Sequence, residues 1–198
     1  MSIGLPSYRI STANSDKSAP ILFVAPTISL WLVYTNSIKV QLSLDSLTGI
    51  LNRKALINAL SEKARSPKKN KKLYFVFIDI DDFKMFNDRY GHGDGDKALR
   101  LVADVLSDMC SHTCGSCARY GGDEFAVIQE SDESADIEQL CAKFKATVAE
   151  RSIEREFKLP INVSVGYAEF GKDALSVPSL IRFADKQMYA NKKKKAFK

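Results

Sequence analysis

A Gly-Gly turn joins two apolar segments at residues 117–129, which read Cys-Ala-Arg-Tyr-Gly-Gly-Asp-Glu-Phe-Ala-Val-Ile-Gln. Gly121 and Gly122 can adopt positive φ, so the chain can turn tightly there and its backbone can approach a ligand closely. We therefore predict a β-hairpin with strands at 117–120 and 124–129, whose tip presents Asp123 and Glu124. On its own such a turn usually only reverses the chain, so a functional interpretation needs a second feature.

The second feature is an acidic segment upstream, where the apolar run 73–80 leads into Asp79-Ile80-Asp81-Asp82-Phe83-Lys84. A continuous apolar run bounded by charge predicts a central strand covered on both faces, with Asp79 at its carboxyl end. If this strand pairs beside the hairpin, carboxylates from both segments crowd together and repel unless protons or cations neutralise them. Mg²⁺ or Mn²⁺ suits such oxygen ligands and also binds substrate phosphates. The sequence thus predicts a two-cation site for a nucleotide triphosphate.

Further polar side chains follow Asp79 closely along the chain. Asn87 and Asp96 offer the acceptor and donor pattern that a guanine edge would use. For His92, a structural hydrogen bond is favoured over a catalytic role.

The remaining patterns predict one α+β domain over residues 45–198. Helical spacing and short apolar runs indicate helices at 52–65, 83–90, 98–109, 137–148 and 180–192, a strand at 161–170, and a glycine-rich break at 91–95. The order helix, β-α-β-β-α-β, helix predicts an antiparallel sheet with helices packed on one side.

The first 44 residues differ in composition from this domain. Residues 1–18 are rich in Ser, Asn and Pro and are predicted to be disordered, and 19–44 are predicted to form an apolar helix. Residues 18–38 carry no charge and are about long enough to span a bilayer, although two prolines weaken the pattern. One interpretation is a membrane anchor at 19–38 with the catalytic domain in the cytoplasm. The other is a packing or dimerising helix of a cytoplasmic protein.

The charge distribution is more informative than the net charge of +5. Basic residues gather at 68–72 and 192–195, and acidic residues gather at 79–96 and 123–138. Basic runs are usually solvated surfaces, and the alternatives are phosphate contacts or an anionic membrane surface. We expect no nucleic-acid partner.

The four cysteines do not resemble a secreted disulfide framework, which favours a reducing cytoplasm. Cys110, His112, Cys114 and Cys117 could hold zinc or act in redox chemistry. Their spacing is unusual for either role, and a helix end running into a strand explains them more simply.

From about Asp45 to Lys195 the chain resembles the GGDEF-domain diguanylate cyclases. The residues that carry the resemblance are, in chain order, Asp45-x-Leu47-Thr48-Gly49, Asp79-Ile80-Asp81-x-Phe83-Lys84-x-x-Asn87-Asp88, Gly91-His92-x-x-Gly95-Asp96, Arg119-x-Gly121-Gly122-Asp123-Glu124-Phe125, Ser164-x-Gly166 and Ala184-Asp185-x-x-Met188-Tyr189. The resemblance implies the ferredoxin-like fold of nucleotidyl cyclases and polymerase palms. It also implies condensation of two GTP into cyclic di-GMP with release of two pyrophosphates. Because each subunit of this family binds one GTP, it implies a homodimer as well.

The resemblance further implies a role for each matching site residue. The metals would be held by Asp79, the backbone carbonyl of Ile80, and Asp123, with Glu124 as a further ligand or proton acceptor. The substrate would be bound by Phe83, Lys84, Asn87, Asp96, Gly121, Gly122 and Lys192, with Asn87 and Asp96 on guanine and Phe83, Lys84 and Lys192 at the phosphates.

Two departures from the family pattern affect these expectations. Position 196 is Ala where family members often carry a phosphate-binding Arg, which leaves Lys192 and Lys195 for the triphosphate. The product-inhibition motif Arg-x-x-Asp is replaced by residues 112–115, His-Thr-Cys-Gly, so feedback through that site is not expected. Besides an active cyclase, two interpretations stay open: a non-catalytic GTP-binding regulator and a membrane-bound interaction module.

Overall fold

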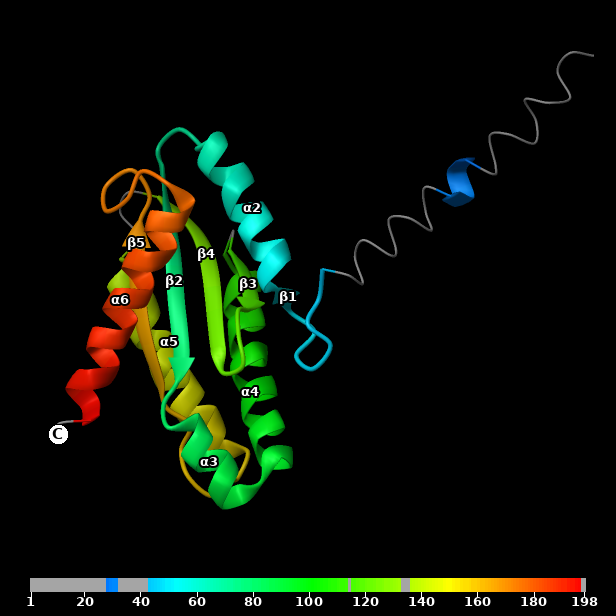
Figure 1. Ribbon diagram of the computed structural model, residues 1–198, viewed down its shortest axis with the longest axis vertical. Helices are drawn as coiled ribbons and strands as arrows, with labels where there is room; N and C mark the ends of the chain where they lie inside the picture. The colour runs from blue at the N-terminus through cyan, green and yellow to red at the C-terminus, as the bar shows by residue number, and fades with distance from the viewer. Residues whose placement is uncertain (1–27, 32–42, 114, 133–135, 197–198) are drawn as a thin grey trace, which may run out of the picture. The chain divides into compact units, whose positions relative to one another are not determined.

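The computed structural model describes residues 28–31, 43–113, 115–132 and 136–196 (Figure 1). The chain divides into two units, residues 1–42 and 43–198. In the first unit only residues 28–31 are described, and they are helical and exposed. The predicted disorder at 1–18 and most of the predicted helix at 19–44 lie outside the described residues. That helix does not reach Leu44, which instead forms an antiparallel bridge with Leu51. Within the described ranges, every helix is too short or too polar to cross a membrane.

The second unit contains the predicted helices and strands in the predicted order, preceded by one short strand, β1 (Leu51–Asn52), that the sequence does not predict. The predicted elements are α2 (Arg53–Arg65), β2 (Lys71–Ile80), α3 (Phe83–Tyr90), α4 (His92–Ser111), β3 (Ser116–Arg119), β4 (Glu124–Asp132), α5 (Ile137–Glu154), β5 (Val163–Glu169) and α6 (Val177–Ala196). The predicted break at 91–95 is wrong, because α4 begins at His92. Only Gly91 separates α3 from α4, with a φ of 86° that glycine adopts without strain.

The five strands form one sheet in the order β1-β3-β4-β2-β5. β2 pairs antiparallel with both β4 and β5, and β3 and β4 form the predicted hairpin. The prediction of a purely antiparallel sheet is wrong at one edge, because β1 pairs parallel with β3. The chain between these two strands includes α2, β2, α3 and α4, which is long enough for the crossover that a parallel pair requires.

Helices cover both faces of the sheet, so the prediction of helices on one side is wrong (Figure 1). Successive side chains of a strand point to opposite faces. In β2, Val76 and Ile78 join the core formed with α4 and α5, whereas Phe75 and Phe77 join the core formed with α2 and α6. This arrangement accounts for the continuous apolar run at 73–80 and confirms that β2 is a central strand.

Glu130 is a buried carboxylate of β4 that connects the sheet to α2 and the loop after it. Its side chain is 5% exposed and accepts hydrogen bonds from Lys63 and, at 2.9 Å, from Lys68. Burial acts to raise the pKa of Glu130, but the two lysines outweigh burial and hold the pKa below its ordinary value of 4.5.

Glu130→Gln is expected to lower the free energy of unfolding by about 1–2 kcal/mol at pH 7. Because the folded-state pKa is depressed, this stabilisation is present above the unfolded-state pKa and is lost as the pH falls through the folded-state value. Urea unfolding should be measured at pH 7 and at successively lower pH. The difference in free energy of unfolding between Glu130→Gln and the unmodified protein should shrink as the pH falls. Asp132→Asn is the control, since the Asp132 side chain is 73% exposed where it pairs with Lys71 and should contribute little. A difference that stays constant with pH would contradict this account.

Candidate functional site

The acidic end of β2 lies beside the tip of the β3–β4 hairpin. Asp79 is directly opposite Glu124 in the register of β2 and β4, and the Ile80 N–H donates to the Asp123 carbonyl at 3.2 Å. The N–H and C=O of a strand residue point to the same side, so the Ile80 carbonyl also faces the hairpin. The fold therefore brings the three predicted metal ligands and Glu124 into one region. Their roles as ligands stay predictions.

The hairpin tip is closed by two backbone hydrogen bonds to one carbonyl. The N–H groups of Tyr120 and Gly121 donate to the Glu124 carbonyl at 2.8 and 3.1 Å. Neither Gly121 nor Gly122 has a positive φ, so the expectation that the turn uses that conformation is not met. A Cβ at 121 would lie 2.4 Å from Glu124 Oε2, so a larger residue there would displace the Glu124 carboxylate. At Gly122 a Cβ would meet no described atom within 4 Å, so the backbone there is open to a ligand.

Arg119, the last residue of β3, contacts both the hairpin tip and Asp45. Its Nε and Nη2 donate to the Gly122 carbonyl at 3.1 and 2.7 Å, and its Nη1 lies 3.4 Å from Asp45 Oδ1. The same Asp45 oxygen accepts hydrogen bonds from the N–H and hydroxyl of Thr48. The sequence motifs include Arg119 and Asp45, but sequence reasoning gave neither a role, because nothing local shows that they meet.

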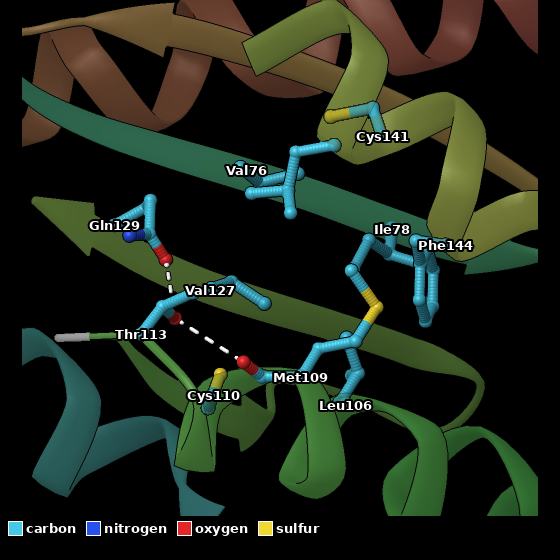
Figure 2. A pocket seen from close by; sticks show the side chains of 11 residues that line it. Val76, Ile78, Leu106, Met109, Cys110, Thr113, Val127, Gln129, Cys141 and Phe144 are labelled. Carbon is cyan, nitrogen blue, oxygen red and sulfur yellow. Dashed lines mark hydrogen bonds between the residues drawn. The ribbon is translucent and has the colours of Figure 1, made fainter. Parts of the chain in front are cut away.

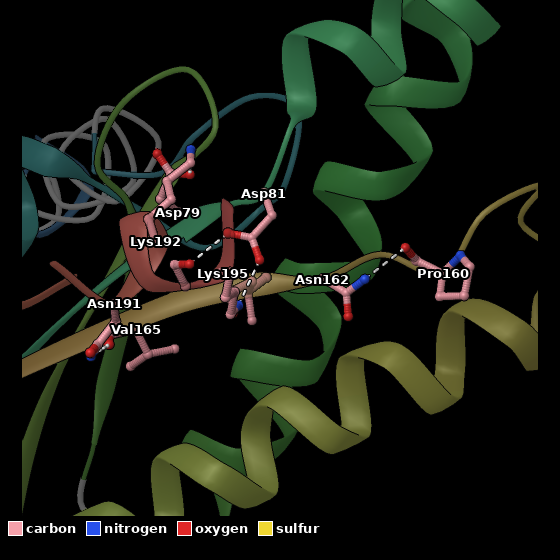
Figure 3. Close-up of polar contacts among 10 residues, drawn as sticks. Asp79, Asp81, Pro160, Asn162, Val165, Asn191, Lys192 and Lys195 are labelled. Carbon is pink, nitrogen blue, oxygen red and sulfur yellow. Dashed lines mark hydrogen bonds and ion pairs between the residues drawn. The ribbon is translucent and has the colours of Figure 1, made fainter. Parts of the chain in front are cut away.

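Two lysines of α6 pair with the two aspartates at the end of β2 (Figure 3). Lys192, predicted to meet phosphates, donates to Asp79 Oδ1. Lys195 donates to Asp81 Oδ2 at 2.7 Å. Burial alone would lower the pKa of Lys192, but the hydrogen bond to Asp79 and its charge raise it.

Carboxylates crowd at this site as the sequence predicts. Burial and then the charges of Asp123 and Asp81 raise the pKa of Asp79, against the opposing effect of Lys192. Burial and the charges of Asp79 and Asp123 likewise raise the pKa of Glu124. The site therefore favours bound positive charge, and its hard oxygen donors fit Mg²⁺ or Mn²⁺.

The described part of the chain contains no cluster of three or more His, Cys, Asp or Glu side chains able to hold a metal ion. Asp79, Asp123 and Glu124 therefore do not meet as a cluster of three carboxylate ligands, and the role of Glu124 as a further ligand stays a prediction. Cys114 lies outside the described residues. Of the predicted cysteine cluster, Cys110 is half-buried near the end of α4 and Cys117 is buried in β3, and neither forms a disulfide. This placement agrees with a helix end that leads into a strand.

The predicted guanine-binding residues lie where α3 meets α4. A Cβ on Gly95 would lie 1.8 Å from Asn87 Oδ1 and 3.3 Å from Phe83, so glycine allows these two helices to approach closely. Asn87 Oδ1 is buried and has no hydrogen-bond partner among the described residues. Asp96 follows on α4 and is half-buried, and Lys84 is exposed on α3. An unsatisfied buried acceptor of this kind is costly unless a ligand pairs with it.

A separate apolar hollow lies on the sheet face covered by α4 and α5 (Figure 2). Val76, Val127, Met109, Cys141 and Phe144 are among its lining residues, and its volume is about 30 Å³. It has room for about one water molecule, so it is no candidate for a nucleotide site.

Comparisons with known proteins agree with the motifs. The family described as "Diguanylate cyclase, GGDEF domain" matches residues 42–197. Diguanylate cyclase A of Treponema denticola is 34% identical over 128 residues, which cover 64% of this chain and 34% of that protein. Diguanylate cyclase DgcP of Escherichia coli is 34% identical over 158 residues, covering 76% of this chain and 45% of that protein. The chain thus spans less than half the length of these relatives.

A solved structure shows the same fold. It contains the coiled coil and GGDEF domain of DgcB from Caulobacter crescentus in complex with c-di-GMP. Its TM-score is 0.76 at 27% sequence identity, and the match covers 89% of this chain and 94% of that chain. By its sequence motifs, its fold and the match over 42–197, the chain belongs to the GGDEF diguanylate cyclase family.

Proposed function

We propose that this protein is a diguanylate cyclase that condenses two GTP into cyclic di-GMP and releases two pyrophosphates. The observation that carries the proposal is the convergence of Asp79 on β2 with Asp123 and Glu124 on the hairpin. The relatives named diguanylate cyclase and the c-di-GMP complex of the DgcB domain support it.

Asp79, the Ile80 carbonyl and Asp123 would hold Mg²⁺ or Mn²⁺ in this proposal. When bound, the metal supplies positive charge that stabilises the attacking and leaving oxygens of phosphoryl transfer. Glu124, whose pKa is raised by burial and by its acidic neighbours, would add a further ligand or accept the proton of the attacking hydroxyl.

The substrate would occupy the space between the hairpin tip and α3. The open backbone at Gly122 would lie against the triphosphate, with Phe83, Lys84 and Lys192 at the phosphates. Asn87 and Asp96 would pair with the guanine edge, because the unsatisfied Asn87 oxygen offers an acceptor there.

Catalysis in this proposal requires two subunits, since each binds one GTP and the 3′-hydroxyl of one nucleotide attacks the α-phosphorus of the other. The test incubates the purified protein with GTP and Mg²⁺ over a range of protein concentrations and quantifies cyclic di-GMP by chromatography. We expect product formation to rise with the square of the protein concentration while monomers predominate. Absence of cyclic di-GMP at every concentration would rule the proposal out.

A non-catalytic GTP-binding regulator is the alternative. Position 196 lacks the Arg that family members often use to bind phosphate, and Lys195 beside it is paired with Asp81. This alternative predicts stoichiometric GTP binding without turnover, which the same incubation followed by equilibrium dialysis would reveal.

Asn87→Ala is expected to weaken GTP binding about tenfold while changing the free energy of unfolding little. The substitution removes the proposed hydrogen bond to guanine, which weakens binding. In the ligand-free protein it removes only a buried oxygen that has no partner within the described residues, so little stabilisation is lost. Binding of GTP and ATP should be compared by calorimetry, because the loss should fall on GTP and reduce the preference for guanine. Asn58→Ala on the exposed side of α2 is the control. An unchanged ratio of GTP to ATP affinity would show that Asn87 does not read the base.

A further inference from the structure

Asp81 lies two residues after Asp79, and both of its carboxylate oxygens are engaged (Figure 3). Oδ1 accepts a hydrogen bond from the Ser164 hydroxyl at 2.6 Å, and Oδ2 accepts one from Lys195 Nζ at 2.7 Å. Lys195 Nζ also donates to the Val163 carbonyl at 2.8 Å, which fixes the ammonium between β5 and the end of β2. The Asp81 side chain is only 14% exposed. Asp81 is therefore held toward β5 by two partners that are themselves anchored.

Asp79 is held differently. Its Oδ1 accepts from Lys192, and Asp79 is the only hydrogen-bond acceptor for the Lys192 ammonium within the described residues, whereas the Lys195 ammonium also donates to the Val163 carbonyl. Its backbone lies opposite Glu124 on the hairpin side and opposite Ser164 on the β5 side. Of the two aspartates, Asp79 thus lies beside the hairpin carboxylates and has the partner that a phosphate can attract away.

We infer that Lys195 is a positioning residue that keeps Asp81 from binding the divalent cation, so that Asp79 is the β2 carboxylate left for the metal. Two neighbouring carboxylates would together attract a cation strongly, and an ammonium on one of them removes that attraction. With Lys192 on Asp79 as well, both aspartates are neutralised in the nucleotide-free protein. Tight metal binding then requires a triphosphate, which supplies oxygens for the metal and an anionic partner for Lys192.

The test measures Mn²⁺ binding to the nucleotide-free protein by electron paramagnetic resonance. Lys195→Met removes the ammonium, keeps most of the aliphatic stem and releases Asp81 Oδ2, so Mn²⁺ affinity is expected to rise about tenfold. Lys195→Arg retains the charge and should bind Mn²⁺ as the unmodified protein does. Lys194→Met removes the same charge from the neighbouring exposed position of α6 and should change the affinity less than about twofold.

Two further variants assign the effect to Asp81. The combination Asp81→Asn with Lys195→Met should abolish the gain, because the released carboxylate is gone. Ser164→Ala removes the other anchor of Asp81 and should raise Mn²⁺ affinity by a smaller factor, so the inference does not depend on one variant. The inference is overturned if neither Lys195→Met nor Ser164→Ala raises the Mn²⁺ affinity. It is also overturned if the gain in affinity persists when Asp81 is replaced by Asn, or if Lys194→Met raises the affinity as much as Lys195→Met does.

The inference rests on the proposed function for the identity of the metal and nucleotide site. Separate measurements nevertheless test the role of Lys195 and the cyclase activity, so either one can be disproved alone. The Mn²⁺ measurement contains no GTP and no turnover. A protein that forms no cyclic di-GMP but gains Mn²⁺ affinity through Asp81 would contradict the cyclase and support the role of Lys195. An active cyclase whose Mn²⁺ affinity does not change in Lys195→Met would support the proposed function and contradict the role of Lys195.

Discussion

Asp79→Asn is expected to lower the rate of cyclic di-GMP formation about a thousandfold or more. The substitution keeps the size and shape of the side chain and removes its charge at the point where β2 meets the hairpin. A neutral amide is a much weaker ligand for Mg²⁺ than a carboxylate, and Lys192 loses the partner that holds it beside the site. Initial rates at saturating GTP and Mg²⁺, with the protein concentrated enough to dimerise, give the comparison.

Asp82→Asn is the matched control for this prediction. Asp82 is an exposed acid three residues further on, and its φ of 54° is one that asparagine also tolerates. We expect the Asp82→Asn variant to form cyclic di-GMP at a rate within about threefold of the unmodified protein, since the charge of Asp82 lies at the surface. If Asp79→Asn retains a tenth or more of the activity while both variants melt normally, the metal site lies elsewhere.

Gly166→Ala is expected to lower the free energy of unfolding by about 3 kcal/mol, at the upper end of the range for overpacked cores. A Cβ on Gly166 of β5 would lie 2.1 Å from the backbone nitrogen of Met188 and 2.3 Å from the carbonyl oxygen of Ala184. These atoms belong to the backbone of α6, so the clash is relieved only by moving the whole helix away from the sheet. Activity should fall as well, because α6 carries Lys192 and Lys195.

Gly93→Ala provides the comparison for Gly166. No described atom lies within 4 Å of a Cβ at Gly93, which is exposed in the first turn of α4. Alanine is favoured over glycine in a helix, so this variant should be neutral or stabilised by up to about 1 kcal/mol. Denaturant unfolding of the two variants under the same conditions measures both effects. Equal stability of Gly166→Ala and the unmodified protein would mean that β5 and α6 are further apart than described.

Sequence patterns predict this fold well where an element is long and buried. The apolar run at 73–80 and the hairpin around Gly121 and Gly122 have patterns of their own, and both are confirmed. β1 has two residues and no pattern, so its parallel pairing and the mixed sheet could not be predicted. Which faces the helices cover depends on how they cross the sheet, which their periodicity alone does not fix.

The site was predictable only in part, for a similar reason. The motifs indicate which side chains carry chemistry, but contacts between distant segments decide what each of them touches. Lys192 and Asp79 are 113 residues apart, and nothing near either residue indicates their ion pair. The unsatisfied Asn87 oxygen under Gly95 likewise depends on how closely two helices approach.

The guanidinium of Arg119 has a mechanical consequence for the domain. It is planar and rigid, so its contacts to the Gly122 carbonyl and to Asp45 move as one body. Asp45 is 74 residues from Arg119 and stands where the polypeptide enters the domain. Arg119 therefore links the first residues of this unit, at Asp45, to the loop that carries Asp123 through a single side chain.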